Sequence, residues 1–556
     1  MTAKAEHNTS GNTARSPAPE IGRRTAAGFA WTFTQGILER GVSAVGQLVL
    51  AYLLVPKDFD LVALVYTVTT FATQLQQFGL KNVLVQRRPE WDRWVTPAFW
   101  MSAALGVVAC VATVMVSPWV ARLYQKHELI DLLLVASLSF PIASIATVPE
   151  ARLSADLRFR LLSRLGAIMS ISRMALSILL AWWLDWGAMS IIAAQPIGAF
   201  IRFLLAWLAT KPKIQAHFEV GKWRSIAGVG GVMLVTSVLG FLTIEGPRIV
   251  LGTMEHAGDL TGLLYFAFSL SDQGTRMLMV NLGAVLMPAL STLVHEPERQ
   301  AKGFERAVRS LLLVGLPLCG LQAVMGAPAF RLLLEEKWHT SILMFIVFSV
   351  AMFGRLTAFP CDAFLLAQHR QNASLLTMIV YTPLFIGLCI LGVIGGRWAE
   401  THGVTLLGLG VGPAEGCTIG IALGMLVYSP IAMYIALYKV RRSWFDVLRI
   451  YARPTVGSLL SCGVAAWILR ALPNTTRGDI IGLVQAPIVV GILYSAWAWW
   501  FARGDVLDLF ARVKSLVPKR LGEKIAKLAG KRGDAVELPA RVAPLGSSED
   551  AQIPGV

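Results

Sequence analysis

The chain has 556 residues, of which 55% are hydrophobic and only 15% are charged, and its mean hydropathy is +0.60. Soluble domains carry about 25% charged residues, so this composition excludes an ordinary soluble protein and predicts an integral membrane protein. The formal net charge of +16 would favour nucleic-acid binding in a soluble chain, but here the basic residues cluster in particular loops, and membrane topology explains them without nucleic acid.

The chain begins with a polar tail and continues into a long series of apolar segments. Residues 1–22 lack an apolar core, so we expect a disordered cytoplasmic tail and not a cleavable signal peptide. A membrane span needs about 20 mainly apolar residues, and fourteen such segments follow. They lie near residues 26–54, 60–86, 95–119, 129–151, 161–184, 187–210, 225–252, 260–294, 307–330, 340–367, 373–396, 404–438, 454–472 and 480–501.

The basic residues of the loops predict the orientation of these spans. With the N-terminus inside, the six cytoplasmic loops hold 21 Lys and Arg, whereas the seven outer loops hold 8. This excess predicts cytoplasmic N- and C-termini and an even number of spans. The outer loops are short, which disfavours a membrane-embedded polymerase or ligase, because such an enzyme would display a large outer loop that carries its chemistry.

The first span, near 26–54, carries Glu39 and Arg40 side by side, although charge at this depth costs a few kcal/mol. At 100° per residue, both fall on one polar arc of the helix, together with Ser43 and Gln47, and apolar residues fill the opposite side. This face must point to a watery cavity or to another helix. A substrate cavity and a purely structural network of ion pairs are both compatible with the pattern.

Polar residues recur in the spans that would open each half of the chain. The span near 60–86 has a polar stripe that includes Gln74 and Gln77. The span near 225–252 carries Glu245 and Arg248 at i,i+3, and the span near 260–294 carries Asp272 and Arg276 at i,i+4, where they can pair along one face. We expect these residues to line one cavity between two related lobes. Secondary candidates, for ligand contact or for helix packing, are Arg173, Arg202, Arg355 and Asp362.

A short internal repeat agrees with two lobes. The sequence DLVALVY at 60–66 recurs as DLTGLLY at 259–265, with Asp, Leu, Leu and Tyr in register. Both copies begin the second helix of a six-helix set, and duplicated lobes are a common plan of transporters. Residues 504–532, which mix apolar and basic residues, are predicted to be a cytoplasmic amphipathic helix on the membrane surface or an ordinary solvated helix. Residues 533–556 are predicted to be disordered.

The remaining motifs predict no catalytic centre, no metal site and no cofactor. The six cysteines lie in apolar segments without a CxxC pair, and the eight histidines form no HExxH motif. There is no Walker A lysine, so the chain is not expected to be an ATP motor. We therefore expect a protein that is not an enzyme.

Several segments follow the pattern of one known family: LAYLLVPKDFDLVAL (50–64), FGLKNVLVQRRP (78–89), TPAFW (96–100), PEARLSADLRFRLLSR (149–164), VLMPALSTL (285–293), EEKWHTSILMF (335–345) and LLAQHRQNA (365–373). They resemble the polysaccharide-transport (Wzx-like) flippases of the multidrug/oligosaccharidyl-lipid/polysaccharide exporter superfamily. Two positions depart from the family pattern, since Asp60 stands where Gly is usual and Glu245 stands near the usual Asp.

This resemblance and the spans together predict an all-α polytopic membrane protein with about 14 transmembrane helices. Two six-helix lobes would surround a central cavity, and two further C-terminal helices would resemble those that border a lipid-tail groove in lipid II flippases. The expected parts are the tail 1–22, an N-lobe 23–210, a C-lobe 211–440, a helix pair 441–503, the basic segment 504–532 and the tail 533–556.

The resemblance implies a flippase of the bacterial inner membrane that moves an undecaprenyl-diphosphate-linked oligosaccharide by alternating access, for exopolysaccharide, lipopolysaccharide or O-antigen synthesis. Its expected partners are that lipid-linked oligosaccharide, membrane lipid, and the polymerase and chain-length components of glycan assembly, without nucleic acid. The alternatives are an ion-coupled multidrug antiporter of the same superfamily and a polysaccharide polymerase or ligase. Arginine forks match phosphate well, which favours the flippase over the antiporter.

Overall fold

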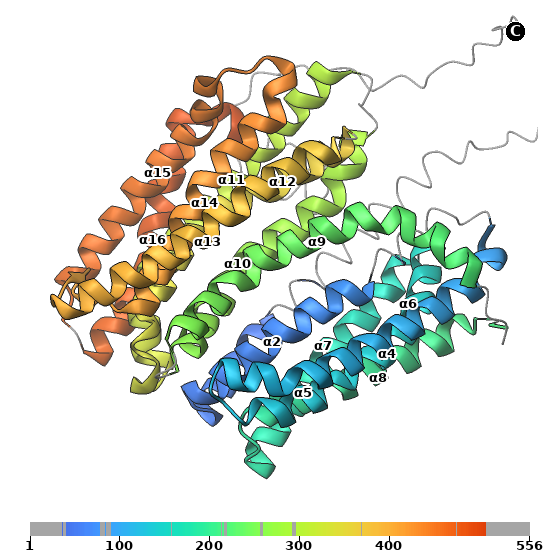
Figure 1. Cartoon of the computed structure of the whole chain (residues 1–556). Helices are drawn as coiled ribbons and strands as arrows, with labels where there is room; N and C mark the ends of the chain where they lie inside the picture. Colours follow the sequence, from blue (N-terminus) through green and yellow to red (C-terminus); the bar gives the residue numbers. More distant parts are fainter. Residues whose placement is uncertain are drawn as a thin grey trace, which may run out of the picture. The chain divides into compact units, whose positions relative to one another are not determined.

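The computed structural model describes residue 36 and residues 41–77, 80, 84, 90–156, 158–212, 214–215, 220–255, 259–291, 296–368, 370–473 and 475–507. Over these residues the chain is almost entirely helical (Figure 1). The predicted tails and nearly all of the basic segment 504–532 lie outside the described residues. The same holds for Glu39 and Arg40.

The described elements follow the order of the predicted spans. The first is a helix over Gly41–Leu53. The others are α2 (Pro56–Gln77), α4 (Trp91–Leu123), α5 (Leu129–Ser137), α6 (Ser139–Ala155), α7 (Phe159–Leu184), α8 (Ala188–Thr210), α9 (Val220–Met254), α10 (Leu260–Ser291), α11 (Pro297–Leu333), α12 (Ser341–Ala367), α13 (Gln371–Thr401), β1 (Thr405–Leu406), β2 (Leu409–Gly410), α14 (Pro413–Leu437), α15 (Trp444–Ala471) and α16 (Thr476–Phe501), with short 3₁₀ turns at Glu336–Trp338 and Tyr438–Val440.

Eleven helical segments of the described chain are long and apolar enough to cross a membrane. Their outward faces carry large apolar side chains, such as Trp182 and Trp500, which are 72% and 81% exposed. Such surface is stable in lipid and unfavourable in water. The all-α membrane class is thus confirmed. The other three predicted spans coincide with the helix Gly41–Leu53, α2 and α10, which are not among these eleven segments. The number of fourteen crossings therefore stays a prediction.

The helices pack in two groups that follow chain order. Helices α2, α4, α5, α6, α7 and α8 (blue to teal in Figure 1) pack against one another, as do α9, α10, α11, α12, α13 and α14. Helices α15 and α16 pack against each other and against α11. Helix α2 contacts both α9 and α10 and so joins the two groups. The domain boundaries predicted from the sequence stay a prediction, and we use the terms N-lobe and C-lobe for these two groups.

Two predicted spans differ from the observed helices. The span near 404–438 begins too early, because residues 405–410 form a hairpin and α14 begins only at Pro413. The pairing of Thr405 with Gly410 leaves Leu407 and Gly408 in the turn with φ of 57° and 81°, the left-handed conformation that a two-residue hairpin requires. The span near 129–151 consists of two helices, α5 and α6, that meet at Leu138.

The two lobes touch where α2 and α10 begin. The buried carboxylate of Asp60 accepts a hydrogen bond from the backbone N–H of Gly262 at 3.0 Å and pairs with Lys126. A Cβ on Gly262 would lie 2.5 Å from the carbonyl oxygen of Pro56, so only glycine permits this close approach. Beside it, the buried Trp338 indole donates to the Ala51 carbonyl at 2.9 Å. The lobes are therefore closed against each other at this end.

Candidate functional site

A cavity of ≈260 Å³ lies between the two lobes. Its walls come from the helix Gly41–Leu53, α2, α7 and α8 on one side and from α9 and α10 on the other, and we call it the inter-lobe cavity. It is lined by Ser43, Gln47, Leu50, Phe59, Tyr66, Arg173, Met174, Ser177, Ile191, Arg248, Tyr265, Phe268, Ser269, Asp272, Gln273 and Arg276.

The helix Gly41–Leu53 turns its polar side to this cavity. Ser43 and Gln47 line it, and the Gln47 amide donates to the hydroxyl of Ser269 on α10. Val45, on the opposite side of the helix, is 61% exposed. The polar arc predicted from the sequence is therefore present over the described part of this helix, because burial between lobes supplies the polar partners that lipid lacks.

Glu245 and Arg248 of α9 form a buried ion pair one helical turn apart. The Thr67 hydroxyl on α2 donates a second hydrogen bond to the Glu245 carboxylate, at 3.2 Å. The Arg248 guanidinium lies 4.9 Å from the centre of the Tyr265 ring, within cation–π range. Arg248 is thus held by an acid and an aromatic face, while the same side chain lines the inter-lobe cavity.

Asp272 of α10 accepts from two arginines. Arg276 pairs with it one turn along the same helix, as the spacing predicted. Arg355 of α12 donates to its other oxygen at 2.9 Å. Only 4% of the Asp272 side chain is exposed, whereas 46% of the Arg276 side chain is exposed. Arg276 therefore keeps donors free toward the cavity, because a guanidinium has five N–H groups and its pairing uses few of them.

Arg173 of α7 also lines the inter-lobe cavity, and no acidic side chain of the described residues lies within ion-pair distance of it. The lining thus holds three arginines, with Arg248 and Arg276, against the one carboxylate of Asp272. Glu245 and Arg355 lie outside this lining but pair with Arg248 and Asp272, and they add one charge of each sign. The described part of the site therefore carries a net positive charge, in a place where low dielectric strengthens its effect on an anion.

The cavity wall also holds an unsatisfied acceptor. The side-chain carbonyl oxygen of Gln273 is buried and has no hydrogen-bond partner among the described residues. A buried polar atom without a partner costs free energy, so a ligand or water in the cavity would stabilise it. Among the described residues, no group of His, Cys, Asp or Glu is arranged to hold a metal ion.

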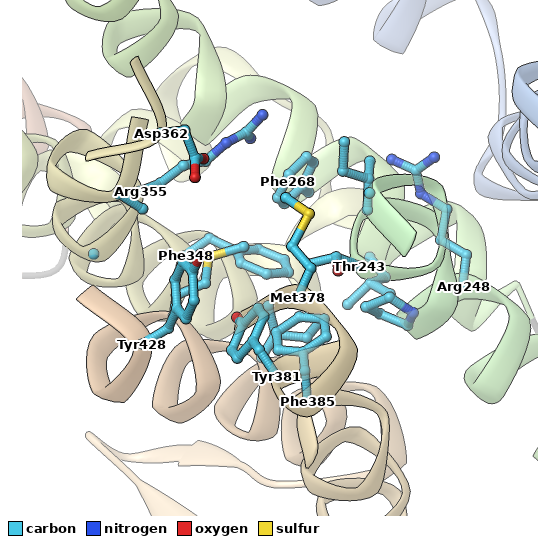
Figure 2. A pocket seen from close by; sticks show the side chains of 18 residues that line it. Thr243, Arg248, Phe268, Phe348, Arg355, Asp362, Met378, Tyr381, Phe385 and Tyr428 are labelled. Atoms are coloured by element: carbon cyan, nitrogen blue, oxygen red, sulfur yellow. The ribbon is translucent and has the colours of Figure 1, made fainter. Parts of the chain in front are cut away.

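A second, mainly apolar cavity of ≈180 Å³ lies inside the C-lobe. Arg248 and Phe268 line both cavities and form the boundary between them. Figure 2 shows Arg355 and Asp362 on one side of this cavity and Arg248 on the opposite side. Asp362 accepts from the Ser374 hydroxyl at 3.4 Å and does not pair with Arg355, although both lie on α12. We call this space the C-lobe cavity.

The other candidate residues lie elsewhere. Arg202 lines neither cavity and pairs with Glu150 of α6, its Nε 2.6 Å from a carboxylate oxygen, so it ties α8 to α6. Gln74 is half-buried and lines neither cavity. The side chain of Gln77, like Glu39 and Arg40, lies outside the described part of the structure.

Several cavity residues carry no charge and were not predicted from the sequence. Tyr66 and Tyr265 line the inter-lobe cavity, and their ring centres are 5.8 Å apart. The signal that could have found them is the repeated heptapeptide, because each tyrosine is its last residue. Phe268 and Ser269 follow in the same helix without any such signal in the sequence.

A third, apolar groove of ≈320 Å³ lies between α15 and α16, with Leu460, Trp497 and Trp500 among its lining residues. Helix α16 is tied to α11 by Arg331, whose guanidinium donates to both oxygens of Asp479, with the shortest contact at 2.7 Å. The helix pair predicted at 441–503 therefore borders an apolar groove on the C-lobe.

Residues 49–343, more than half of the chain, match a family model described as "Polysaccharide biosynthesis protein". The chain is 24% identical over 388 residues to the lipopolysaccharide biosynthesis protein WzxC of Escherichia coli (strain K12), covering 69% of this chain and 77% of WzxC. It is 20% identical over 489 residues to the succinoglycan biosynthesis transport protein ExoT of Rhizobium meliloti (strain 1021), covering 86% of this chain and 93% of ExoT.

Two solved structures share the fold. The lipid II flippase MurJ, in an inward closed conformation, superposes with a TM-score of 0.68 at 13% identity, covering 85% of this chain and 99% of that one. A multidrug resistance MATE family transporter of the MOP superfamily, in an inward-facing conformation, superposes with a TM-score of 0.55 at 14% identity, covering 76% and 99%. At such identities the likeness establishes the architecture alone.

Proposed function

Because the chain belongs to the polysaccharide biosynthesis protein family, we propose that this multi-pass membrane protein is a flippase for a lipid-linked oligosaccharide. Its substrate would be an undecaprenyl-diphosphate-linked repeat unit, carried from the cytoplasmic to the periplasmic leaflet of a bacterial inner membrane. The product would serve exopolysaccharide or O-antigen synthesis. We expect cytoplasmic termini, and we expect polymerase and chain-length components to act on the delivered substrate.

The observation that carries this proposal is the excess of arginine in the inter-lobe cavity. Arg173 has no acidic partner among the described side chains, and Arg276 is half exposed to the cavity. A diphosphate presents several oxygens to which a guanidinium can donate paired hydrogen bonds. The sugar head and the diphosphate would occupy this cavity, while most of the polyprenyl chain stays in lipid.

The closed contact between the lobes supports an alternating-access mechanism. Asp60 and Gly262 hold α2 against α10, and at the same end Trp338, just before α12, donates to Ala51 of the helix Gly41–Leu53. Polar groups and close backbone contacts hold this end, and such a contact can separate as a unit when the lobes rock. Release of the substrate to the other leaflet would require this contact to open.

The two alternative functions find less support. A drug–cation antiporter shares the fold, but it would be served by an apolar cavity with acidic residues and few arginines. A polymerase or ligase finds less support, because the relative ExoT is described as a transport protein and the fold is shared with the lipid II flippase MurJ. The protein is accordingly not an enzyme.

The test is the fate of lipid-linked intermediates after Arg276→Ala and Arg173→Ala. We expect the undecaprenyl-diphosphate oligosaccharide to accumulate on the cytoplasmic leaflet and polymer output to fall about tenfold or more, as expected when a charge-assisted hydrogen bond is lost. Arg299→Ala is the matched control, because the Arg299 side chain is 66% exposed and pairs with Glu296 outside the cavity. Normal translocation by both cavity variants would show that the cavity does not bind the diphosphate.

A further inference from the structure

The C-lobe cavity described above has a composition that differs from that of the inter-lobe cavity. Its wall consists mainly of apolar and aromatic side chains, among them Phe348, Phe385, Met378, Tyr381 and Tyr428 (Figure 2). The rings of Tyr381 and Tyr428 are stacked, with their centres 4.0 Å apart. Such a wall offers contact area and few hydrogen bonds, and apolar burial is its main source of binding energy. The lining residue Ile244 is 45% exposed, so the wall formed by α9 is not closed.

The charged groups of this cavity already have partners. Arg248 pairs with Glu245, Arg355 donates to Asp272, and the Asp362 carboxylate accepts from the Ser374 hydroxyl at 3.4 Å. The uncharged Thr243 shares a hydrogen bond with Thr382. A sugar placed here would bury hydroxyl groups that need partners of their own. The lining therefore favours an apolar ligand over a carbohydrate.

The position of the cavity indicates which apolar ligand it would take. Arg248 and Phe268 belong to both cavities, so a molecule that places an anion on Arg248 has its next atoms at the entrance of the C-lobe cavity. An apolar cavity of about 150 Å³ holds six-carbon benzene. The ≈180 Å³ observed here is thus of the right size for one five-carbon isoprene unit.

We propose that the C-lobe cavity binds the isoprene unit next to the diphosphate of the lipid-linked substrate. This inference rests on the proposed function and adds a subsite to it. Arg248 holds the diphosphate at the boundary, the sugar extends into the inter-lobe cavity, and the first isoprene unit packs among the rings of the C-lobe. The site thereby distinguishes a prenyl diphosphate from an anion without an apolar chain.

The first experiment compares the affinity of the purified full-length protein for geranyl diphosphate and for inorganic diphosphate. We expect the prenyl compound to bind about tenfold tighter or more, as is usual for a buried apolar group of this size. Ala358→Phe places a ring in the cavity, since Ala358 lines it, and should abolish this preference without changing the affinity for inorganic diphosphate. Leu384→Phe, at a position on α13 that is 56% exposed, is the control and should keep the preference.

The second experiment needs no substitution. A prenyl diphosphate with a photoreactive group on its first isoprene unit is cross-linked to the wild-type protein, and the labelled peptides are mapped. Labelling of Met378, Phe385 or Tyr428 is the expected result. Labelling of the α15–α16 groove, at Leu460, Trp497 or Trp500, or of any other segment would overturn the subsite.

The outcomes separate the subsite from the proposed function. If geranyl and inorganic diphosphate bind equally well, or if Ala358→Phe keeps the preference, the subsite is wrong and the flippase proposal stands. If neither compound binds the wild-type protein, the inter-lobe cavity does not recognise a diphosphate, and the proposed function fails with it.

Discussion

Tyr66 and Tyr265 occupy the same position of a repeated heptapeptide, and their rings meet 5.8 Å apart across the boundary between the two lobes. Asp60, the first residue of one copy, accepts from the backbone of Gly262 in the other copy. The repeat therefore places equivalent segments of the two lobes face to face, at the wall of the inter-lobe cavity.

Replacement of Tyr265 by alanine should weaken binding of the anionic ligand. The Arg248 guanidinium lies 4.9 Å from the centre of this ring, and a cation–π contact contributes about 0.5–2 kcal/mol. We expect the affinity for inorganic diphosphate to fall up to about thirtyfold, as measured by titration calorimetry. Tyr265→Phe keeps the aromatic face and should bind almost as the wild type does; equal losses in both variants would contradict the role of the ring.

Glu245→Ala should destabilise the protein strongly. It leaves the buried guanidinium of Arg248 without its carboxylate, and breaking a buried pair costs about 3–5 kcal/mol. Thermal unfolding of the detergent-solubilised protein measures the effect. The control is Glu296→Ala, which breaks an exposed pair with Arg299 and should change stability by less than about 1 kcal/mol. Similar unfolding temperatures for the two variants would show that the buried pair contributes no stability.

Gly262→Ala should force apart the end where α2 meets α10. The added Cβ would lie 2.4 Å from the backbone nitrogen of Asp60, which the rigid backbone there cannot accommodate without a shift. Spin labels at Lys57 on α2 and at Glu335 just before α12, whose side chains are exposed, should report a longer or broader distance distribution. Gly395→Ala is the control, because nothing lies within 4 Å of a Cβ at that position. An unchanged distance distribution in Gly262→Ala would show that the added methyl group does not separate α2 from α10.

Arg331→Ala should loosen α16 from the C-lobe. The Arg331 guanidinium donates to both carboxylate oxygens of Asp479 and is the polar link between α11 and α16. Hydrogen bonds to charged groups contribute about 1.5–3 kcal/mol, so we expect faster amide hydrogen exchange in α16 and unchanged exchange in α6. Asp479→Asn keeps part of the link and should give an intermediate effect. Equal exchange in all three proteins would show that packing alone holds the helix.

The membrane class, the helices and the polar face of the first helix could be predicted from the sequence. These features depend on local sequence, because an apolar stretch of sufficient length is stable in lipid, and a polar arc on such a helix must face another helix or a water-filled cavity. The pair Asp272–Arg276 followed in the same way, since residues four apart on a helix are neighbours. Family motifs along residues 50–373 then indicated the function that the family match supports.

Which charges share a site depends on the packing of the helices and could not be predicted in this way. Arg173 and Arg202 looked alike in the sequence, yet one lines the inter-lobe cavity and the other ties two helices together through Glu150. Arg355 pairs with Asp272 on another helix and leaves Asp362, on its own helix, to Ser374. The spacing along one helix fixes neighbours on that helix alone. Partners across helices depend on how the lobes pack, and that packing joins residues as far as 287 positions apart, such as Ala51 and Trp338.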